Sequence, residues 1–356
     1  MSSENKMGVM PINKLILSMS IPMMLSMLIQ ALYNLVDSMF VAQLSSDGFV
    51  ALALVYPIQT LMIAVCVGTG VGFNALLARR LGEDRPDEAN RVVANGYFVY
   101  LVCWVVFLVL GVGLAPVFME LFAPGQPQVI DYGIQYLSIV TGASVGICMQ
   151  FAGERTLQAT GNTVGPMVIQ GIGAVINLIL DPLLIFGIGP FPRMEVAGAA
   201  LATVLGQVVG MVVGLCMVRR SSIVRLSFRG FRPDSAIIRT MFRVGVPAIL
   251  VQALATVMNL GMNLILPLFT ASGVFILGAY FKLQSFLFMP VNGLNNALIP
   301  IVSFNYGAQQ QGQREKEHKL AQQGNHQAGI GRSQGLEGGT EDHRHPGAYE
   351  GEGNEA

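Results

Sequence analysis

Long apolar stretches, separated by short polar segments, recur along the chain from residue 12 to about residue 303. A helix of about 20 apolar residues is long enough to cross the hydrocarbon core of a bilayer. The pattern therefore predicts eight transmembrane helices. Their expected ranges are 12–43, 50–76, 93–119, 131–153, 163–188, 196–218, 241–269 and 274–303.

The composition agrees with this pattern. Of the 356 residues, 53% are hydrophobic and 12% are charged, whereas about 25% are charged in a typical soluble domain. The mean hydropathy is +0.56. We therefore expect an all-α, polytopic membrane protein that is embedded in the lipid bilayer. The net charge of zero gives no indication of a nucleic-acid partner.

Basic residues gather on one side of the predicted membrane. With a cytoplasmic N-terminus, fourteen Lys and Arg residues fall in inner segments, against Arg193 alone in the outer loops. The positive-inside rule thus favours eight spans and this orientation. Lys282 falls within the eighth span, where a charge either lines a cavity or snorkels to the interface; its depth favours a cavity. The fourteen inner residues are Lys6, Lys14, Arg79, Arg80, Arg85, Arg91, Arg155, Arg219, Arg220, Arg225, Arg229, Arg232, Arg239 and Arg243.

The chain repeats itself at an offset of 225 residues. SIPMMLSMLIQALYNL, from Ser20, returns as GVPAILVQALATVMNL, from Gly245. Because six spans precede the second copy, both copies enter the membrane from the same side, as parallel repeats do. We therefore expect two six-helix lobes, with residues 1–220 forming the first lobe and the Arg-rich residues 221–240 linking it to the second. Identical residues in the two copies include Pro22 and Pro247, Asn34 and Asn259, Gly48 and Gly273, Gln59 and Gln284, Gly68 and Gly293, and Gly82 and Gly307.

The second copy is incomplete in this sequence. Residues 241–307 supply two spans, and residues 308–356 are rich in Gly, Gln, Glu and His, a composition that does not fold alone. The tail is either a natural cytoplasmic extension or out-of-frame sequence after a frameshift. The break falls inside a repeat unit, which favours the frameshift.

Two acidic residues lie inside apolar stretches of the first half. Asp37 and Asp181 each fall about eight residues before a polar turn, which places both about 12 Å below the outer helix ends. Asn34 precedes Asp37 by three residues and Asn177 precedes Asp181 by four, so each pair shares a helix face. Two carboxylates in one low-dielectric cavity are able to share a proton or Na⁺. The alternative is structural, with each acid hydrogen-bonded to neighbouring helices.

Other kinds of chemistry lack their sequence patterns. The cysteines show no metal spacing, and all four histidines lie between residues 318 and 345, outside the spans. No G-x-x-x-x-G-K-[ST] sequence is present, which argues against ATP as the direct energy source. We therefore expect no enzymatic activity, no cofactor and no bound metal, apart from H⁺ or Na⁺ as a coupling ion at Asp37 and Asp181.

Several segments, in order, resemble the multidrug and toxic compound extrusion (MATE) transporters, in particular their bacterial DinF- and MepA-like branch. They include IPMMLSMLIQALYNLVDSMFVAQL, ARRLGEDRPDEA, RTLQATGNTVGPM, INLILDPLLIFG and FKLQSFLFMPVNGLNNALIPIVSFNYGA. The resemblance covers residues 10 to 310. It implies a multi-pass protein of the bacterial cytoplasmic membrane that exports small amphipathic, often cationic, drug-like compounds by alternating access, in exchange for H⁺ or Na⁺.

The resemblance also implies a network in the first lobe that couples ion binding to a bend of the first helix. By position, this network comprises Pro22, Gln30, Asp37, Tyr136, Asn177, Asp181 and Thr203. The family pattern has twelve spans, so we expect this chain to be inactive alone. The competing hypotheses are a non-transporting membrane scaffold and a flippase-type exporter of lipid-linked intermediates.

Overall fold

Helices account for the regular structure of the residues that the structure describes. The computed structural model describes residues 5–41, 43, 46–265, 280, 284, 287–309 and 312. Most of the expected polar tail, 308–356, and residues 266–279 of the last expected spans lie outside this part. The helices are α1 (Lys6–Val9), α2 (Ile12–Val41), α3 (Ser46–Gly82), α4 (Pro86–Phe122), α5 (Pro127–Gly142), α6 (Val145–Ala159), α7 (Val164–Phe186), α8 (Glu195–Arg219), α9 (Ser235–Ile265) and a further helix, Leu287–Gln309.

Eight helical segments of the described residues are long and apolar enough to cross a membrane, which confirms the expected number. Several are longer than the sequence pattern predicts. α3 and α4 have 37 residues each, or about 55 Å at 1.5 Å per residue, whereas the hydrocarbon core is about 30 Å thick. The apolar pattern marks only the part of each helix that would lie in lipid, and the charged ends continue the same helix.

The expected fourth span, 131–153, lies within one membrane-length segment, Pro127–Ala159, which consists of two helices. α5 ends at Gly142 and α6 begins at Val145. The hydroxyl of Thr141 donates to the Leu137 carbonyl at 2.6 Å, and the hydroxyl of Ser144 donates to the Thr141 carbonyl at 2.7 Å. These side chains bond to the backbone where the helix is interrupted, which is how Ser and Thr compete with a helical ladder.

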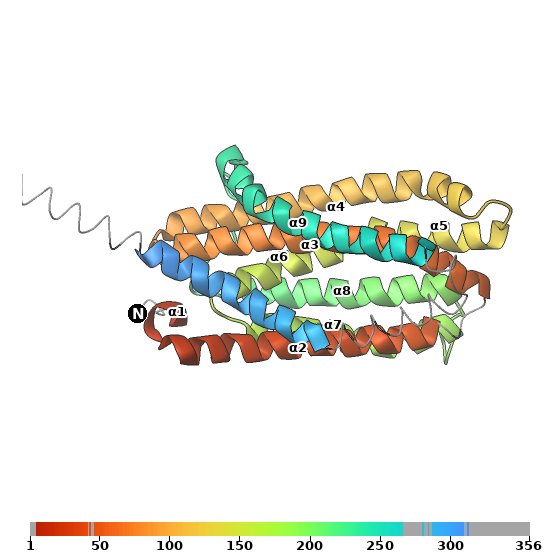
Figure 1. Cartoon of the computed structure of the whole chain (residues 1–356), viewed down its shortest axis with the longest axis horizontal. Helices are drawn as coiled ribbons and strands as arrows, with labels where there is room; N and C mark the ends of the chain where they lie inside the picture. Colours follow the sequence, from red (N-terminus) through yellow and green to blue (C-terminus); the bar gives the residue numbers. More distant parts are fainter. Residues whose placement is uncertain are drawn as a thin grey trace, which may run out of the picture. The chain divides into compact units, whose positions relative to one another are not determined.

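Helices α2 to α8 form the first bundle (Figure 1). α7 packs against α8 and α2, α6 packs against α8, and α4 packs against α5. Glycines bring α7 and α8 together, because a Cβ at Gly206 would lie 2.9 Å from the carbonyl oxygen of Gly173. Such close backbone approach is typical of helix packing in membranes. It also brings Asn177, one turn beyond Gly173, against α8.

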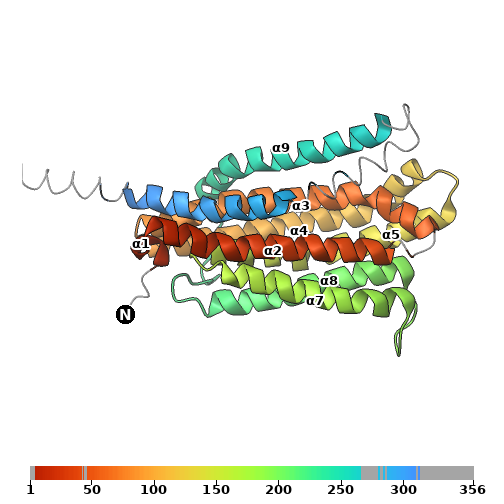
Figure 2. The same cartoon turned by 60° about the horizontal axis from the view of Figure 1, so that its bottom comes forward.

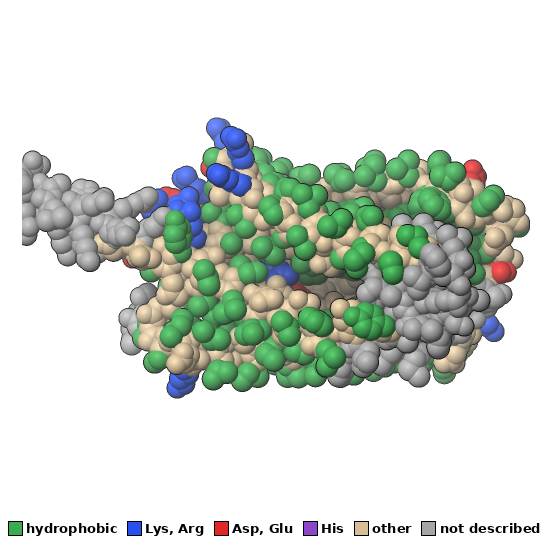
Figure 3. Space-filling model, in the orientation of Figure 1, with side chains coloured by type: hydrophobic (Ala, Val, Ile, Leu, Met, Phe, Trp, Pro, Cys, Tyr) green, Lys and Arg blue, Asp and Glu red, His purple; other side chains and the backbone are tan. Residues whose placement is uncertain are grey.

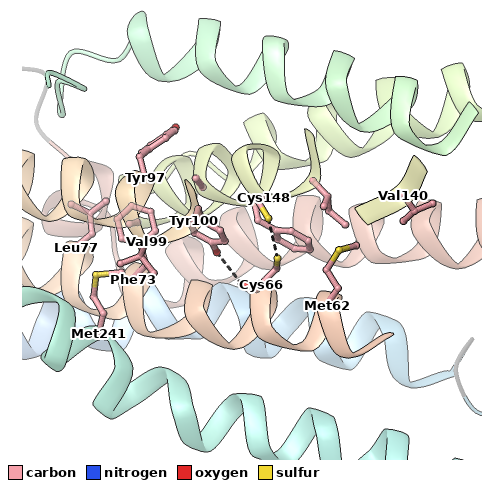
Figure 4. Close-up of a cluster of buried hydrophobic side chains, with 14 of the residues drawn as sticks. Met62, Cys66, Phe73, Leu77, Tyr97, Val99, Tyr100, Val140, Cys148 and Met241 are labelled. Atoms are coloured by element: carbon pink, nitrogen blue, oxygen red, sulfur yellow. Dashed lines mark hydrogen bonds between the residues drawn. The ribbon is translucent and has the colours of Figure 1, made fainter. Parts of the chain in front are cut away.

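The centre of this bundle is apolar and closely packed. Figure 4 shows side chains of α3, α4 and α6 meeting there, with Met241 of α9 beside them. The Tyr100 hydroxyl donates to the Cys66 carbonyl at 2.9 Å, and the sulfurs of Cys66 and Cys148 lie 3.7 Å apart. The face shown in Figure 3 is also largely apolar. Large apolar side chains are exposed on the described helices; Leu121, for example, is 72% exposed. A bundle that is apolar inside and outside is suited to a lipid environment.

The two described helices of the second repeat pack against α2 and α3 of the first repeat. α9 runs along α3 (Figure 2), and the Leu287–Gln309 helix contacts α2 and α3. Gly68 approaches Ile249, while its repeat equivalent Gly293 approaches Met24, which is the equivalent of Ile249. The contacts are therefore reciprocal, and they support the expected parallel two-fold relationship between the repeats.

Charged residues close the end of the bundle where α3 passes into α4. Glu83 accepts from Arg79 at 2.9 Å and from Arg80 at 2.7 Å, while Arg80 and Arg85 pair with Glu88. Burial by itself would raise the pKa of the Glu83 carboxyl, but the hydrogen bonds and charges of Arg80 and Arg79 outweigh burial and hold this pKa below its ordinary value.

Candidate functional site

Asp181 lies at the centre of the candidate site, on α7, and is fully buried. The amide nitrogen of Asn177 donates to Asp181 Oδ1 at 3.3 Å, so the expected pairing of these residues along one helix face is confirmed. The same nitrogen lies 3.5 Å from Thr203 Oγ1 on α8, and the Thr203 hydroxyl donates to the Ala199 carbonyl. Three of the residues predicted from the sequence therefore form one connected group.

The other predicted acid, Asp37, lies on α2, which packs directly against α7. Its side chain and that of Asn34 lie outside the part of the chain that the structure describes. The helices end earlier than the polar turns suggest, at Val41 and Phe186. Asp37 and Asp181 therefore lie about 6 and 8 Å from their helix ends rather than 12 Å. The corrected depths remain similar to each other.

A cavity of about 40 Å³ adjoins this group. Its walls come from α2, α6, α7 and α8, and most of its side chains are polar. It is lined by Tyr33, Gln150, Gln170, Gly173, Ala174, Asn177, Thr203, Gly206 and Gln207. A larger cavity, of about 260 Å³, lies at the charged end among Arg80, Arg91 and Asp234 and contains none of the predicted site residues.

A further buried acid, Glu154, was not predicted from the sequence. It lies on α6, is 3% exposed, and accepts from Gln150 at 2.9 Å and from Gln170 at 3.3 Å. Its neighbour Arg155, which the predicted spans place in an inner segment, lies within the same helix and is 2% exposed. The apolar pattern ends at residue 153, whereas the helix continues to Ala159. The polar residues Gln150 and Glu154, one helical turn apart, are the sequence pattern from which this site could have been predicted.

Arg155 points away from the cavity residues, toward the second repeat. Its guanidinium donates to Gln158 at 2.9 Å and to Asn296, on the Leu287–Gln309 helix, at 3.5 Å. Asn74 of α3 also donates to Gln158. Figure 3 shows a hollow in this face of the bundle, with basic and acidic atoms visible inside it.

The remaining predicted residues are more scattered. Pro22 lies inside α2, and Gln30 is half-buried on the same helix. Tyr136 is buried on α5, where its hydroxyl lies 3.4 Å from Gln59 Oε1; neither Gln30 nor Tyr136 lines the cavity. Lys282 lies outside the described residues. Within the described part of the chain, no three His, Cys, Asp or Glu side chains are grouped to hold a metal ion.

A bundle of eight membrane-length helices, with two parallel repeats and buried carboxylates beside a polar cavity, is a multi-pass membrane protein of the transporter type. Residues 22–183 match the model of the MatE family. The chain is 30% identical, over 87% of its length and 68% of the relative's, to the FAD transporter of Shewanella oneidensis strain MR-1. These matches show that the chain belongs to the MATE family of transporters.

Other relatives agree with this assignment. The chain is 25% identical to the multidrug export protein MepA of Staphylococcus haemolyticus, over 82% of this chain and 64% of that protein. A crystal structure of MATE in complex with MaD3S superimposes with a TM-score of 0.79 at 25% identity, covering 86% of this chain and 69% of the other. The chain thus spans about two thirds of the length of these relatives.

Proposed function

We propose that this chain acts in multidrug export, exchanging amphipathic, often cationic, compounds for H⁺ or Na⁺ by alternating access, and that it does so only with a complete second lobe. The observation that carries the proposal is the buried group of Asp181, Asn177 and Thr203 beside a polar cavity. A carboxylate inside a membrane protein is costly unless it is paired or functional. The multidrug export proteins among the relatives support the same activity.

Asp181 and Asp37 are the proposed ion-coupling residues. α2 and α7 pack together, and both acids lie at similar depth on them. Binding of a proton or Na⁺ would neutralise a carboxylate in a low-dielectric setting, and the release of that ion would favour a cationic substrate in its place. Asn177 and Thr203 hold Asp181 in position, and Pro22 gives α2 a point at which it is able to bend.

Drug-driven ion flux in membrane vesicles tests this proposal, with the downstream reading frame restored because the chain is expected to be inactive alone. Asp181→Asn and Asp37→Asn should each reduce H⁺- or Na⁺-coupled drug flux to the level of empty vesicles, because neither amide is able to exchange an ion. Asp131→Asn is the matched control, since Asp131 is exposed on α5 away from the cavity. Unchanged flux in both the Asp37 and the Asp181 variant would contradict the coupling role and leave the two acids with a structural role. Absence of flux from the unaltered protein would favour the membrane scaffold.

Export of FAD is a second candidate, because the relative with 30% identity is named a FAD transporter. FAD carries phosphates, and the buried carboxylates Asp181 and Glu154 would repel them. A flippase for phosphate-bearing lipid intermediates meets the same objection. Competition of FAD with a cationic drug in the vesicle assay separates FAD export from export of cations. Inhibition of cation flux by FAD, or transport of FAD itself, would favour FAD export.

We also propose a cytoplasmic N-terminus in the bacterial cytoplasmic membrane. Lys and Arg side chains gather at the end of the bundle where α1 lies (Figure 3). The positive-inside rule applies to such an end even with Arg155 removed from the count. Labelling of an introduced cysteine at Ser227, in the α8–α9 linker, by a membrane-impermeant reagent should require that the cells be opened.

A further inference from the structure

The larger cavity, of about 260 Å³ at the charged end, lies between α3, α4 and the beginning of α9. It coincides with the boundary between apolar and charged sequence on all three helices. The apolar ranges expected from the sequence end at residue 76 on α3 and begin at residues 93 and 241 on α4 and α9. Such boundaries mark the level of the lipid headgroups. The cavity walls are formed by Leu76, Arg80, Glu88, Arg91, Val92, Asp234, Ala236, Ile237 and Thr240.

The charges in these walls leave one arginine without an ionic partner. The carboxylate of Asp234 accepts from two backbone N–H groups at the start of α9, at 2.9 and 3.4 Å. Glu88 pairs with Arg80 at 3.1 Å and with Arg85 at 2.9 Å. Arg91 is exposed and takes part in none of the ion pairs of the described residues. Its guanidinium is therefore available to an anion, and its planar shape matches a phosphate group.

The linker between α8 and α9 adds basic and aromatic side chains beside the cavity. It is held against α4, because the side-chain oxygens of Asn90 and Asn95 accept from the backbone N–H groups of Arg225 and Asp234, at 2.7 and 2.9 Å. Phe228 is 53% exposed, and its neighbours in the linker include the exposed residues Arg225, Arg229 and Arg232. Figure 3 shows basic side chains gathered at the end of the bundle where α9 begins. Aromatic and basic side chains together are typical of a protein surface at the headgroup level of a membrane.

Exposed apolar side chains continue from the cavity toward the middle of two helices. On α9, Val244 and Val251 follow Thr240 by four and eleven residues and are 44% and 70% exposed. On α4, Val102 follows Arg91 by eleven residues and is 43% exposed. Eleven residues are about three helical turns, so each set shares a helix face. A lipid with its headgroup in the cavity would therefore find apolar surface for its acyl chains.

We propose that this cavity binds the headgroup of an anionic phospholipid, and that Arg91 binds its phosphate. The volume of about 260 Å³ suits a headgroup, because pockets for drug-sized ligands measure about 300–1,000 Å³. A zwitterionic lipid carries the same phosphate together with an ammonium group, which the nearby arginines would repel. The site should consequently prefer the anionic lipid. It lies apart from the group around Asp181, so the inference does not rest on the proposed function.

Native mass spectrometry of the purified chain, titrated separately with two lipids, tests the proposal without any ion gradient. The lipids are dioleoylphosphatidylglycerol and dioleoylphosphatidylcholine, which differ only in the headgroup. The first should bind at least about tenfold more tightly, the effect of one hydrogen bond between charged groups. Arg91→Gln should bring the ratio of the two affinities close to one. Ala236→Phe, which fills the cavity without changing its charge, should weaken binding of phosphatidylglycerol at least about tenfold. Both positions are exposed, so both variants should fold.

Arg219→Gln is the matched control, since it removes the same charge from an exposed position at the end of α8, outside the cavity walls. This variant should keep the preference for phosphatidylglycerol. Glycerol 3-phosphate, present at the same concentration as the lipid, distinguishes a lipid site from a site for free phosphate and should leave lipid binding unchanged. Four results would overturn the proposal: equal affinity for the two lipids, equal losses in the Arg91 and Arg219 variants, undiminished binding to Ala236→Phe, or displacement of the lipid by glycerol 3-phosphate.

Discussion

Gly82 of α3 and Gly307 of the Leu287–Gln309 helix occupy equivalent positions of the two repeats and lie on opposite sides of one helix crossing. A Cβ at Gly82 would collide with the Phe304 carbonyl, and one at Gly307 would collide with the Arg79 carbonyl. Phe304 and Arg79 are themselves equivalent positions. The two glycines thus allow the backbones of α3 and its counterpart to touch.

Substituting alanine at either glycine should destabilise the protein. Each added methyl meets backbone, which is unable to move aside as a flexible side chain does, so we expect a loss of about 1–3 kcal/mol. Thermal unfolding of the detergent-solubilised protein measures it. Gly113→Ala is the matched control: it lies inside α4 with nothing within 4 Å of an added Cβ, and alanine there should add up to about 1 kcal/mol. Equal stability of all three variants would contradict the close crossing.

The ion pairs of Glu83 predict a pH dependence of stability. The pKa of Glu83 is lowered from 4.5 in the folded protein by Arg80 and Arg79, which outweigh burial. Its stabilising effect is therefore complete well above pH 4.5 and is lost as the pH falls through the lower, folded pKa. Glu83→Gln should cost about 1 kcal/mol at pH 7, since the arginines are partly exposed.

The melting temperature of the unaltered protein should consequently fall more steeply below pH 4.5 than that of Glu83→Gln. Asp87→Asn, a nearby acid without an ion pair in the described structure, serves for comparison. Parallel melting curves for Glu83→Gln and the unaltered protein across this range would argue that the pairs contribute nothing.

Thr203 gives a finer test of the site than removal of an acid. Thr203→Val keeps the side-chain volume but removes the oxygen that lies 3.5 Å from the Asn177 amide. The loss of one such hydrogen bond costs about 1 kcal/mol. The ion concentration that gives half-maximal drug flux should therefore rise about fivefold. Thr203→Ser retains the hydroxyl and should behave like the unaltered protein. A similar defect in both variants would point to packing rather than hydrogen bonding.

Pro22 is the proposed bending point of α2, and its replacement should affect stability and transport in opposite directions. Pro22→Ala restores a backbone donor inside the helix, so we expect stability to rise by about 1–3 kcal/mol. Drug flux should fall, because a stiffer α2 bends less readily. Pro116→Ala, at an exposed position inside α4, should give the stability gain without the loss of flux. Loss of flux in both variants would show that transport does not depend specifically on the bending of α2 at Pro22.

The number of spans and the Asn177–Asp181 pair could be predicted because both depend on local patterns. Apolar length determines the first, and helical spacing determines the second. Glu154 could not be found in the same way. It lies beyond the apolar part of α6, and only packing against α7 and α8 buries it among Gln150 and Gln170.

The break in the fourth span and the reciprocal crossing have similar explanations. Thr and Ser residues are common in membrane helices, so the presence of Thr141 and Ser144 alone does not mark an interruption. The repeat predicted that Gly68 and Gly293, or Gly82 and Gly307, are equivalent. It did not predict which residues each would face, because that depends on how the two copies meet in space.

The reciprocal contacts have a consequence for the origin of the chain. When position i of one copy meets position j of the other, and j meets i, the two surfaces are self-complementary, as in an isologous dimer. Gly68 with Ile249, and Gly293 with Met24, obey this rule. A single ancestral repeat carrying this surface would have paired with an identical subunit about a two-fold axis. Duplication and fusion of its gene would then have converted a homodimer into one polypeptide without remodelling the interface.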